Sequence, residues 1–183
     1  EWLELSEENG NFPLFYRNKL PVINEMLNNS TNGSSYLFKF EADPPTVTMQ
    51  KRLKGLTTGG LPTFIDFRYN FHSPEIVADN WVEKLVKNRK NIVFLGDDTW
   101  TNLFRRKFKR SFPFPSFNTR DLHTVDNGIL ENLKTEFGKN DWDIMILHFL
   151  GVDHVGHTFG PNSKEMSEKL IQMNEALKQI FEL

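Results

Sequence analysis

An aspartate and a histidine four residues apart form the most chemically suggestive pair in this 183-residue sequence. Asp153 and His157 follow an apolar segment and would lie on one side of a single helical turn. A carboxylate oxygen and an imidazole nitrogen that converge suit Zn²⁺ or another divalent ion. Gly151 and Gly156 would let the backbone bend closely around them. The spacing favours half of a metal site over a polar loop whose side chains only satisfy local hydrogen bonds.

The other histidines have weaker claims to a metal. His154 would point away from the pair in any helical turn, which predicts a role beside the metal ligands or against substrate. His148 lies within a predicted strand and is expected to be structural, while His72 and His123 lie in loops without evident partners. Zinc sites usually have at least three protein ligands. The remaining ligands must therefore come from distant carboxylates or from sequence outside these residues.

A threonine after two prolines is the second candidate. Pro44 and Pro45 stiffen an extended approach, and the pattern predicts a helix over residues 47–56 that begins near Thr48. A hydroxyl at a helix N-terminus meets free N–H groups and the positive end of the helix dipole, which favour an alkoxide and a phosphate. Taken alone, the pattern favours an ordinary helix cap at Thr46 or Thr48 over a nucleophile.

Acidic and aromatic residues follow another predicted strand. Asp97 or Asp98 could bind a metal or an ammonium group. Adjacent side chains on an extended segment point to opposite sides, so the two are not expected to bind the same ion. Trp100 offers either a cation–π face or ordinary core packing. The basic run over residues 105–110 favours a solvated loop over contact with anionic lipid headgroups.

Strand-like and helix-like segments alternate along the chain, which predicts an α/β fold with a largely parallel sheet flanked by helices. Strands are expected over residues 36–40, 91–95 and 143–150, and residues 101–124 are expected to be irregular. Helices are expected over residues 20–27 and 47–56, from Ser73-Pro74 through Leu85, over 129–137, and after a cap at Ser163. Ligands of open α/β sheets bind at the carboxyl ends of the strands, so the chemistry is expected there.

Composition narrows the class of protein further. With 38% hydrophobic residues and 17 phenylalanines the chain can bury one core, and a net charge of −2 gives no reason to expect a nucleic-acid partner. The absence of cysteine excludes disulfides and thiolate-bound metal. No membrane-spanning apolar stretch or signal peptide is visible. Overlapping Asn-x-Ser/Thr sequons within residues 28–34 mildly favour a lumenal or extracellular setting.

The order of these motifs is more specific than any one of them. Pro45-Thr46-Val47-Thr48, then Gly96-Asp97-Asp98-Thr99-Trp100, then Asp153 with Gly156-His157 resembles the alkaline phosphatase superfamily. The sequences of these motifs most resemble those of the GPI ethanolamine phosphate transferases, in particular their type 3 class. The matching stretches are residues 43–50, 56–59, 61–66, 94–100, 114–118, 124–130 and 148–157.

This resemblance implies an alkaline-phosphatase-like fold and a role for each candidate. Residues 1–183 would be a fragment of a single lumenal catalytic domain in an endoplasmic reticulum membrane protein. Thr48 would be the nucleophile that forms a phospho-threonine intermediate. Asp153 and His157 would bind one of two divalent ions, both zinc in the complete domain, and Asp98, Trp100 and His154 would contact substrate. Other metal ligands would lie before and after these residues, so the fragment alone is expected to be inactive.

The resemblance also implies substrates and partners. The donor would be phosphatidylethanolamine, and the acceptor a mannose of the GPI anchor precursor. Membrane attachment would come from segments outside these residues, and a small membrane subunit is left open as a partner. Two alternatives stand beside this reading: a metal-dependent phosphodiesterase of the same superfamily, which shares the first half of the reaction, and a non-catalytic truncated domain. Residues 114–118 and 124–130 match the transferases and favour the first reading.

Overall fold

A parallel sheet lies at the centre of the molecule. The computed structural model describes residues 14–28, 35–38, 49–60 and 75–183. Within them the strands are β1 (Ile92–Asp97), β2 (Arg110–Phe114) and β3 (Ile144–His148), and the sheet has the order β2-β1-β3. Both strand pairs are parallel. The expected α/β class with a parallel sheet is therefore confirmed.

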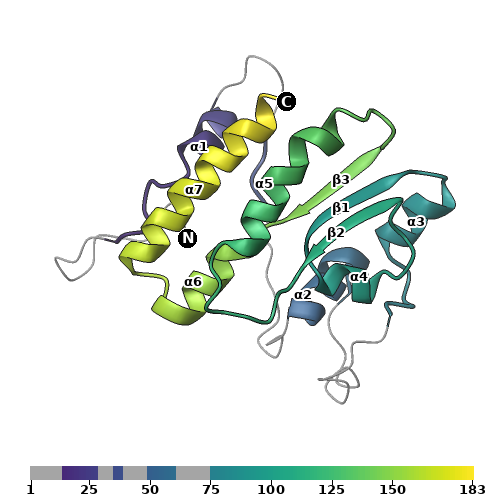
Figure 1. The fold of residues 1–183 in the computed structure, drawn as a ribbon, viewed down its shortest axis with the longest axis horizontal. Helices are drawn as coiled ribbons and strands as arrows, with labels where there is room; N and C mark the ends of the chain where they lie inside the picture. The colour runs from purple at the N-terminus through teal and green to yellow at the C-terminus, as the bar shows by residue number, and fades with distance from the viewer. Residues whose placement is uncertain (1–13, 29–34, 39–48, 61–74) are drawn as a thin grey trace.

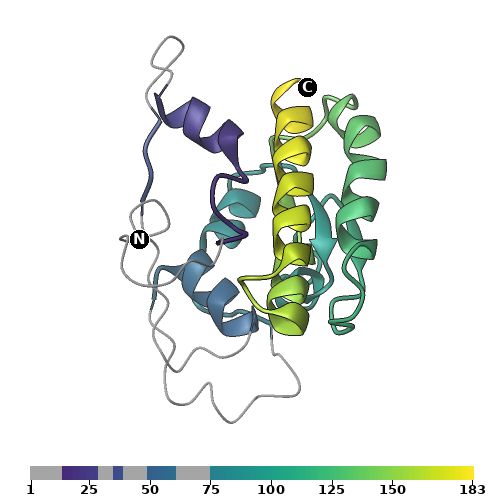
Figure 2. The ribbon, with the colours of Figure 1, turned by 90° about the vertical axis from the view of Figure 1, so that its left-hand side faces the viewer.

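Helices cover both faces of this sheet. One layer contains α2 (Met49–Thr58), α3 (Trp81–Lys87) and α4 (Thr99–Leu103), and the other contains α5 (Thr124–Phe137) with α7 (Lys164–Phe181) and α6 (Gly151–Phe159) beside it (Figure 1). The remaining helix, α1 (Pro21–Asn28), packs on α7, where the backbone N–H of Val22 donates to Asn174 Oδ1 at 3.0 Å. Figure 2 shows α7 running alongside α5.

The central strand explains why two layers form. Every residue of β1 is buried, and successive side chains of a strand point to opposite faces. Phe94 joins the cluster built with α2, α3 and α4, whereas Val93 and Leu95 join the cluster built with α5. A strand that is apolar on both faces needs a helical layer on each, as is usual for parallel sheets.

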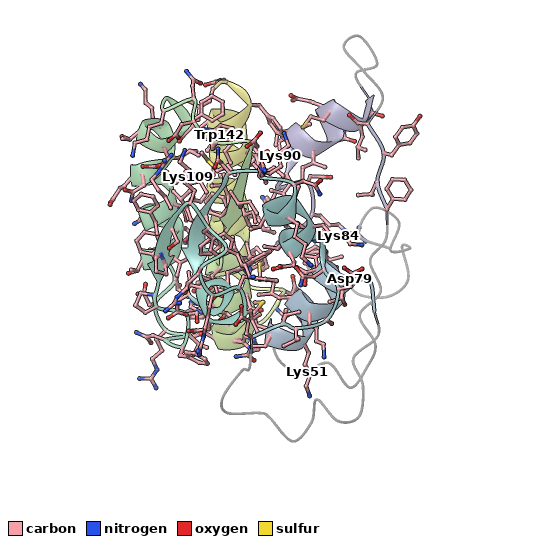
Figure 3. All side chains as sticks on the ribbon, turned by 90° about the vertical axis from the view of Figure 1, so that its right-hand side faces the viewer. Lys51, Asp79, Lys84, Lys90, Lys109 and Trp142 are labelled. Atoms are coloured by element: carbon pink, nitrogen blue, oxygen red, sulfur yellow. The ribbon has the colours of Figure 1, made fainter. Side chains whose placement is uncertain are left out.

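The amino ends of the three strands meet at one end of the molecule. Lys90, Lys109 and Trp142 each lie just before a strand, and Figure 3 shows all three at the same end, opposite Lys51 of α2. Asp143 reinforces this end, because its carboxylate accepts from the Asn91 backbone N–H at 2.8 Å and from Lys90 Nζ at 3.0 Å. The carboxyl ends of the strands consequently share the opposite edge.

Several predicted helices are confirmed. The segments expected over residues 20–27 and 129–137 form α1 and the second half of α5, and the one expected over 47–56 is described from Met49 as α2. Ser163 caps α7 as predicted, since its Oγ accepts from the Met166 backbone N–H at 3.1 Å.

The helix predicted from Ser73-Pro74 through Leu85 is confirmed from Trp81 onward, and its start is wrong where it is described. Residues 73 and 74 lie outside the described residues, and residues 75–80 are not helical. Helix α3 begins at Trp81, because Asn80 has extended backbone and its side chain accepts from the Glu83 N–H at 2.8 Å. Val77, within the range of the predicted helix, is exposed.

The prediction that residues 101–124 are irregular is also wrong. This stretch contains the end of α4, the strand β2 and the start of α5. Proline disfavours a central strand, but β2, which contains Pro113, lies at an edge of the described sheet, where proline is tolerated. Arg110 of the basic run begins β2 and is ion-paired with Glu136 and Asp141, so this residue is not part of a solvated loop.

The expected strand over residues 36–40 is not seen where it can be checked. Residues 35–38 have no regular structure, and Tyr36 and Phe38 are exposed. Residues 39 and 40, like most of the sequon stretch, lie outside the described residues. Across the described part of the chain, no helix is both long and apolar enough to span a bilayer.

Replacement of Gly128 should destabilise the fold although glycine is a poor helix former. A Cβ at Gly128 of α5 would lie 2.3 Å from the Phe114 ring. We expect Gly128→Ala to cost about 1–3 kcal/mol of unfolding free energy through overpacking, measured by urea denaturation. Gly138→Ala is the control, because its Cβ would meet nothing closer than 3.5 Å. Equal stability of the two variants would contradict the close packing of α5 on β2.

Candidate active site

The predicted metal pair lies on a helix that starts just beyond the sheet. Helix α6 begins three residues after β3 ends and carries both side chains. Asp153 Oδ2 and His157 Nε2 are 3.4 Å apart, and their side chains are 35% and 66% exposed. The convergence that the four-residue spacing predicted is therefore present.

This donor set fits part of a divalent metal site. One carboxylate oxygen and one imidazole nitrogen lie close together and are open to solvent, and both are ligands that zinc accepts. Among the residues that the structure describes, no three His, Asp, Glu or Cys side chains gather closely enough to hold an ion. Helix α6 thus offers two candidate ligands on one helical turn, and their metal-binding role stays a prediction.

His154, between these ligands in sequence, is buried against backbone carbonyls. Its Nδ1 lies 2.6 Å from Asp121 O and its Nε2 lies 3.0 Å from Ser116 O. The ring therefore joins α6 to the loop between β2 and α5. Both ring nitrogens are engaged by these carbonyls. The part of His154 in substrate binding stays a prediction.

A second group lies where β1 and β3 end. Trp100 Nε1 donates to His148 Nδ1 at 2.7 Å, so a neutral His148 carries its proton on Nε2. The buried Asp97 accepts from the Thr99 N–H through Oδ1, while its Oδ2 has no hydrogen-bond partner among the described residues and lies 3.9 Å from His148 Nδ1. His148, expected to be structural, is held by α4 and faces the carboxylate of β1.

Burial sets the protonation state of His148. Loss of water around the ring lowers the pKa of His148, and the negative charges of Asp97, Asp153 and Asp126 oppose that shift only in part. The net direction is downward, which favours the neutral ring.

Asp98 and Trp100 differ in what they present to the edge of the sheet. Ser116, just after β2, donates its hydroxyl to Asp98 Oδ1 at 2.6 Å, and Asp98 is partly exposed. Trp100 is buried, with its ring stacked on Phe94 at 5.8 Å between centroids. The packing alternative therefore describes how the Trp100 ring lies, and its substrate role stays a prediction.

The predicted nucleophile directly precedes the described residues of α2 in the sequence. Thr48 and Thr46 lie outside the described residues. Helix α2 is described from the next residue, Met49, which packs against both hydrophobic clusters. Figures 1 and 2 show α2 and α6 at the same end of the molecule.

The sequence patterns did not predict a cluster of three side chains near α6. His123, expected to lack a partner, lies 3.0 Å from Lys169 Nζ through its Nδ1. Lys169 is also paired with Asp126 of α5 at 3.2 Å. One sequence feature could have revealed this cluster: Lys169 lies three residues after Met166 and four before Met173, which puts it on the apolar stripe of its helix.

The comparisons with known proteins define the family of this chain. The chain belongs to the type I phosphodiesterase / nucleotide pyrophosphatase family, whose model matches residues 22–183. It is similar to GPI ethanolamine phosphate transferase 3, catalytic subunit, of Homo sapiens, with 53% identity over 80% of this chain and 13% of the relative. The GPI ethanolamine phosphate transferase 3 of Saccharomyces cerevisiae is 43% identical over 98% of this chain and 18% of its own length.

A type 2 relative is also similar. The GPI ethanolamine phosphate transferase 2, catalytic subunit, of Homo sapiens is 43% identical over 81% of this chain and 15% of the relative. The chain thus spans less than a fifth of each of these relatives. No solved structure matches it. The resemblance found from the motifs is confirmed.

Protonation of His148 should weaken the fold in mild acid. Because burial lowers the pKa of His148, the unfolded chain binds more protons than the folded chain between the folded pKa and about 6.5. The contribution of neutral His148 to the free energy of unfolding is then fully present above about pH 6.5. It is lost as the pH falls from there toward the folded pKa. We expect His148→Gln to flatten the loss of unfolding free energy between pH 7.5 and 5.5, measured by denaturant titration. An unchanged slope of unfolding free energy against pH in this variant would contradict the lowered pKa of His148.

Proposed function

We propose that this chain supplies the nucleophile and part of a metal site to a phosphoethanolamine transferase of GPI anchor biosynthesis. One observation carries the proposal. The exposed Asp153–His157 pair lies at the carboxyl edge of a parallel sheet, in a chain 43–53% identical to relatives that bear this transferase name. That edge is where α/β folds bind their ligands.

The proposed reaction has two steps. In the first, the Thr48 hydroxyl oxygen attacks the phosphorus of phosphatidylethanolamine, and the diacylglycerol oxygen leaves with a proton. In the second, a mannose hydroxyl of the GPI precursor attacks the same phosphorus and restores the Thr48 hydroxyl. Helix α2, described from Met49 directly after Thr48, lies at the same end of the molecule as α6, which supports this role for Thr48.

Asp153 and His157 would hold a divalent ion, zinc in this proposal, beside the attacked phosphoryl group. Such an ion acts as a Lewis acid on phosphoryl oxygens, and a second zinc completes many phosphoryl-transfer sites. Ligands for the second ion would come from sequence outside residues 1–183. The fit rests on the donor chemistry of the pair and on its exposure.

Three further side chains are proposed for the substrate pocket. Asp98, partly exposed at the end of β1, offers a carboxylate to the ethanolamine ammonium. His154 and Trp100 lie deeper and would shape the pocket through Ser116 and His148, which they contact. The ethanolamine end of the donor would therefore lie over β1 and β2.

The proposed setting is the lumenal side of the endoplasmic reticulum membrane. Residues 1–183 would be part of one lumenal catalytic domain, with membrane segments and a small membrane subunit as its partners. The sequons within residues 28–34 support exposure to the lumen.

A hydrolase is the second candidate, because the family that the chain belongs to is described as type I phosphodiesterase / nucleotide pyrophosphatase. In that case water, in place of a mannose hydroxyl, would take the phosphoryl group from Thr48. Supply of a GPI acceptor separates the two candidates: a transferase yields phosphoethanolamine-modified glycolipid, and a hydrolase yields free phosphoethanolamine whether or not acceptor is present.

Loss of the Thr48 hydroxyl should abolish transfer. In the complete protein that contains this sequence, we expect Thr48→Ala to leave no measurable transfer of radiolabelled ethanolamine phosphate to GPI precursor, because no covalent intermediate can form. Thr46→Ala, two residues earlier, is the matched control and should keep activity. Transfer by Thr48→Ala at the parent rate would refute the nucleophile assignment.

Loss of either metal ligand should lower bound zinc as well as rate. We expect Asp153→Ala and His157→Ala to reduce the zinc content of the complete protein, measured by elemental analysis, and to slow transfer more than ~100-fold. Glu168→Ala is the control, since Glu168 also forms an exposed pair over one helical turn, with Lys164 at 3.4 Å. Unchanged zinc content in both ligand variants would exclude this metal site.

A further inference from the structure

Opposite charges are buried where α5, α6 and α7 meet. Asp126 of α5 and Lys169 of α7 have side chains that are 0% and 2% exposed, and Lys169 Nζ lies 3.2 Å from Asp126 Oδ2. Buried charges are costly unless they are paired and hydrogen-bonded. The contacts around this pair therefore decide whether it is stable at this junction.

Lys169 is satisfied by groups on the chain that leads into α5. Its ammonium donates to Leu122 O at 2.5 Å, lies 3.0 Å from His123 Nδ1, and donates to Gln172 Oε1 at 2.7 Å. Together with the bond to Asp126, these contacts hold the start of α5 against the second turn of α7.

The other oxygen of Asp126 holds the start of α6. Asp126 Oδ1 accepts from the Leu150 N–H at 2.9 Å and from the Gly151 N–H at 3.1 Å. The N-cap position of α6 is occupied by Leu150, whose side chain has no acceptor. A carboxylate from another helix thus replaces the usual cap and lies at the positive end of the α6 dipole.

The first residue of α6 is glycine for a reason visible in this contact. A Cβ at Gly151 would lie 2.2 Å from Asp126 Oδ2 and 2.8 Å from Lys169 Nζ. It would also lie 2.7 Å from the backbone oxygen of Leu122. Only a residue without a side chain lets α6 approach the pair this closely.

We infer that the Asp126–Lys169 pair is a positioning device for the metal-binding helix, and that Asp126 is a positioning residue for the reaction proposed above. Asp153 follows Gly151 by two residues and His157 lies one turn further on, within a helix of nine residues. A shift at the first turn is carried directly to both ligands. The inference rests on the proposed function, because it requires that Asp153 and His157 bind a metal.

The test measures zinc affinity in the complete protein by competition with a fluorescent chelator. Asp126→Asn keeps the shape of the side chain but removes the charge that pairs with Lys169 and faces the helix dipole. We expect the zinc dissociation constant to rise about 10-fold, as it does when residues that orient the metal ligands, without binding the metal themselves, are changed.

Glu136→Gln is the matched control. Glu136 is also a buried carboxylate of α5, but it lies at the other end of that helix and pairs with Arg110 at 2.6 Å and with Lys139. We expect this variant to lose thermal stability as Asp126→Asn does and to keep the parent zinc affinity. An effect on zinc affinity that is no larger in Asp126→Asn than in Glu136→Gln would overturn the inference.

Gly151→Ala tests the same contact without removing a charge, and it replaces Asp126→Asn if that variant does not fold. It should also raise the zinc dissociation constant, whereas Gly138→Ala, with no close contact, should not. Asp153→Asn separates the two levels of the argument. If it leaves zinc affinity unchanged, the metal assignment fails and this inference fails with it. If it weakens binding while Gly151→Ala and Asp126→Asn do not, only the positioning role is overturned.

Discussion

Burial of β1 on both faces is the constraint on which the rest of the structure depends. Its side chains divide between two clusters, so helices must cover both sides of the sheet. Parallel pairing with β2 and β3 then brings all three carboxyl ends to one edge. Gly96, with φ of +140°, pairs with His148, and a Cβ there would lie 2.4 Å from His148 O. This close approach places Asp97 of β1 beside His148 of β3.

Buried charges determine how the helices sit on that sheet. Helix α5 has a buried carboxylate near each end, Asp126 at its start and Glu136 at its close. Burial raises the pKa of Glu136, but hydrogen bonds from Lys139 and Arg110 outweigh it, so the net pKa is lowered and the group is ionised at neutral pH. Arg110 belongs to β2 and Lys169 to α7. Each end of α5 is thus paired with a different neighbour, β2 at its end and α7 at its start.

Residues 114–118 and 124–130, the two stretches that favour a transferase over a phosphodiesterase, contact one another in the fold. Phe114, the first residue of one stretch, lies against Gly128 of the other, and Asp126 of the second stretch caps α6. Residues 114–118 also supply Ser116, whose hydroxyl reaches Asp98 and whose carbonyl meets His154. These stretches therefore form a support that joins β1, α5 and α6 behind the candidate metal pair.

The sequence by itself determined the features that depend on short separations. The α/β class follows from local periodicity, and the convergence of Asp153 with His157 follows from four-residue spacing on a helix. Strand β2 was not predicted, and it contains Pro113, which an edge strand tolerates. The start of α3 was predicted too early, because the cap at Asn80 sets it at Trp81.

Tertiary structure alone decided which distant side chains meet. Trp100 and His148 are 48 residues apart, and Asp126 and Lys169 are 43 apart, so no local pattern links either pair. The packing of α4 on the sheet brings the first pair together, and the packing of α7 against α5 brings the second. Lys169 appeared in the sequence as a polar residue on an apolar stripe, and only the buried carboxylate opposite it shows why a lysine is stable there.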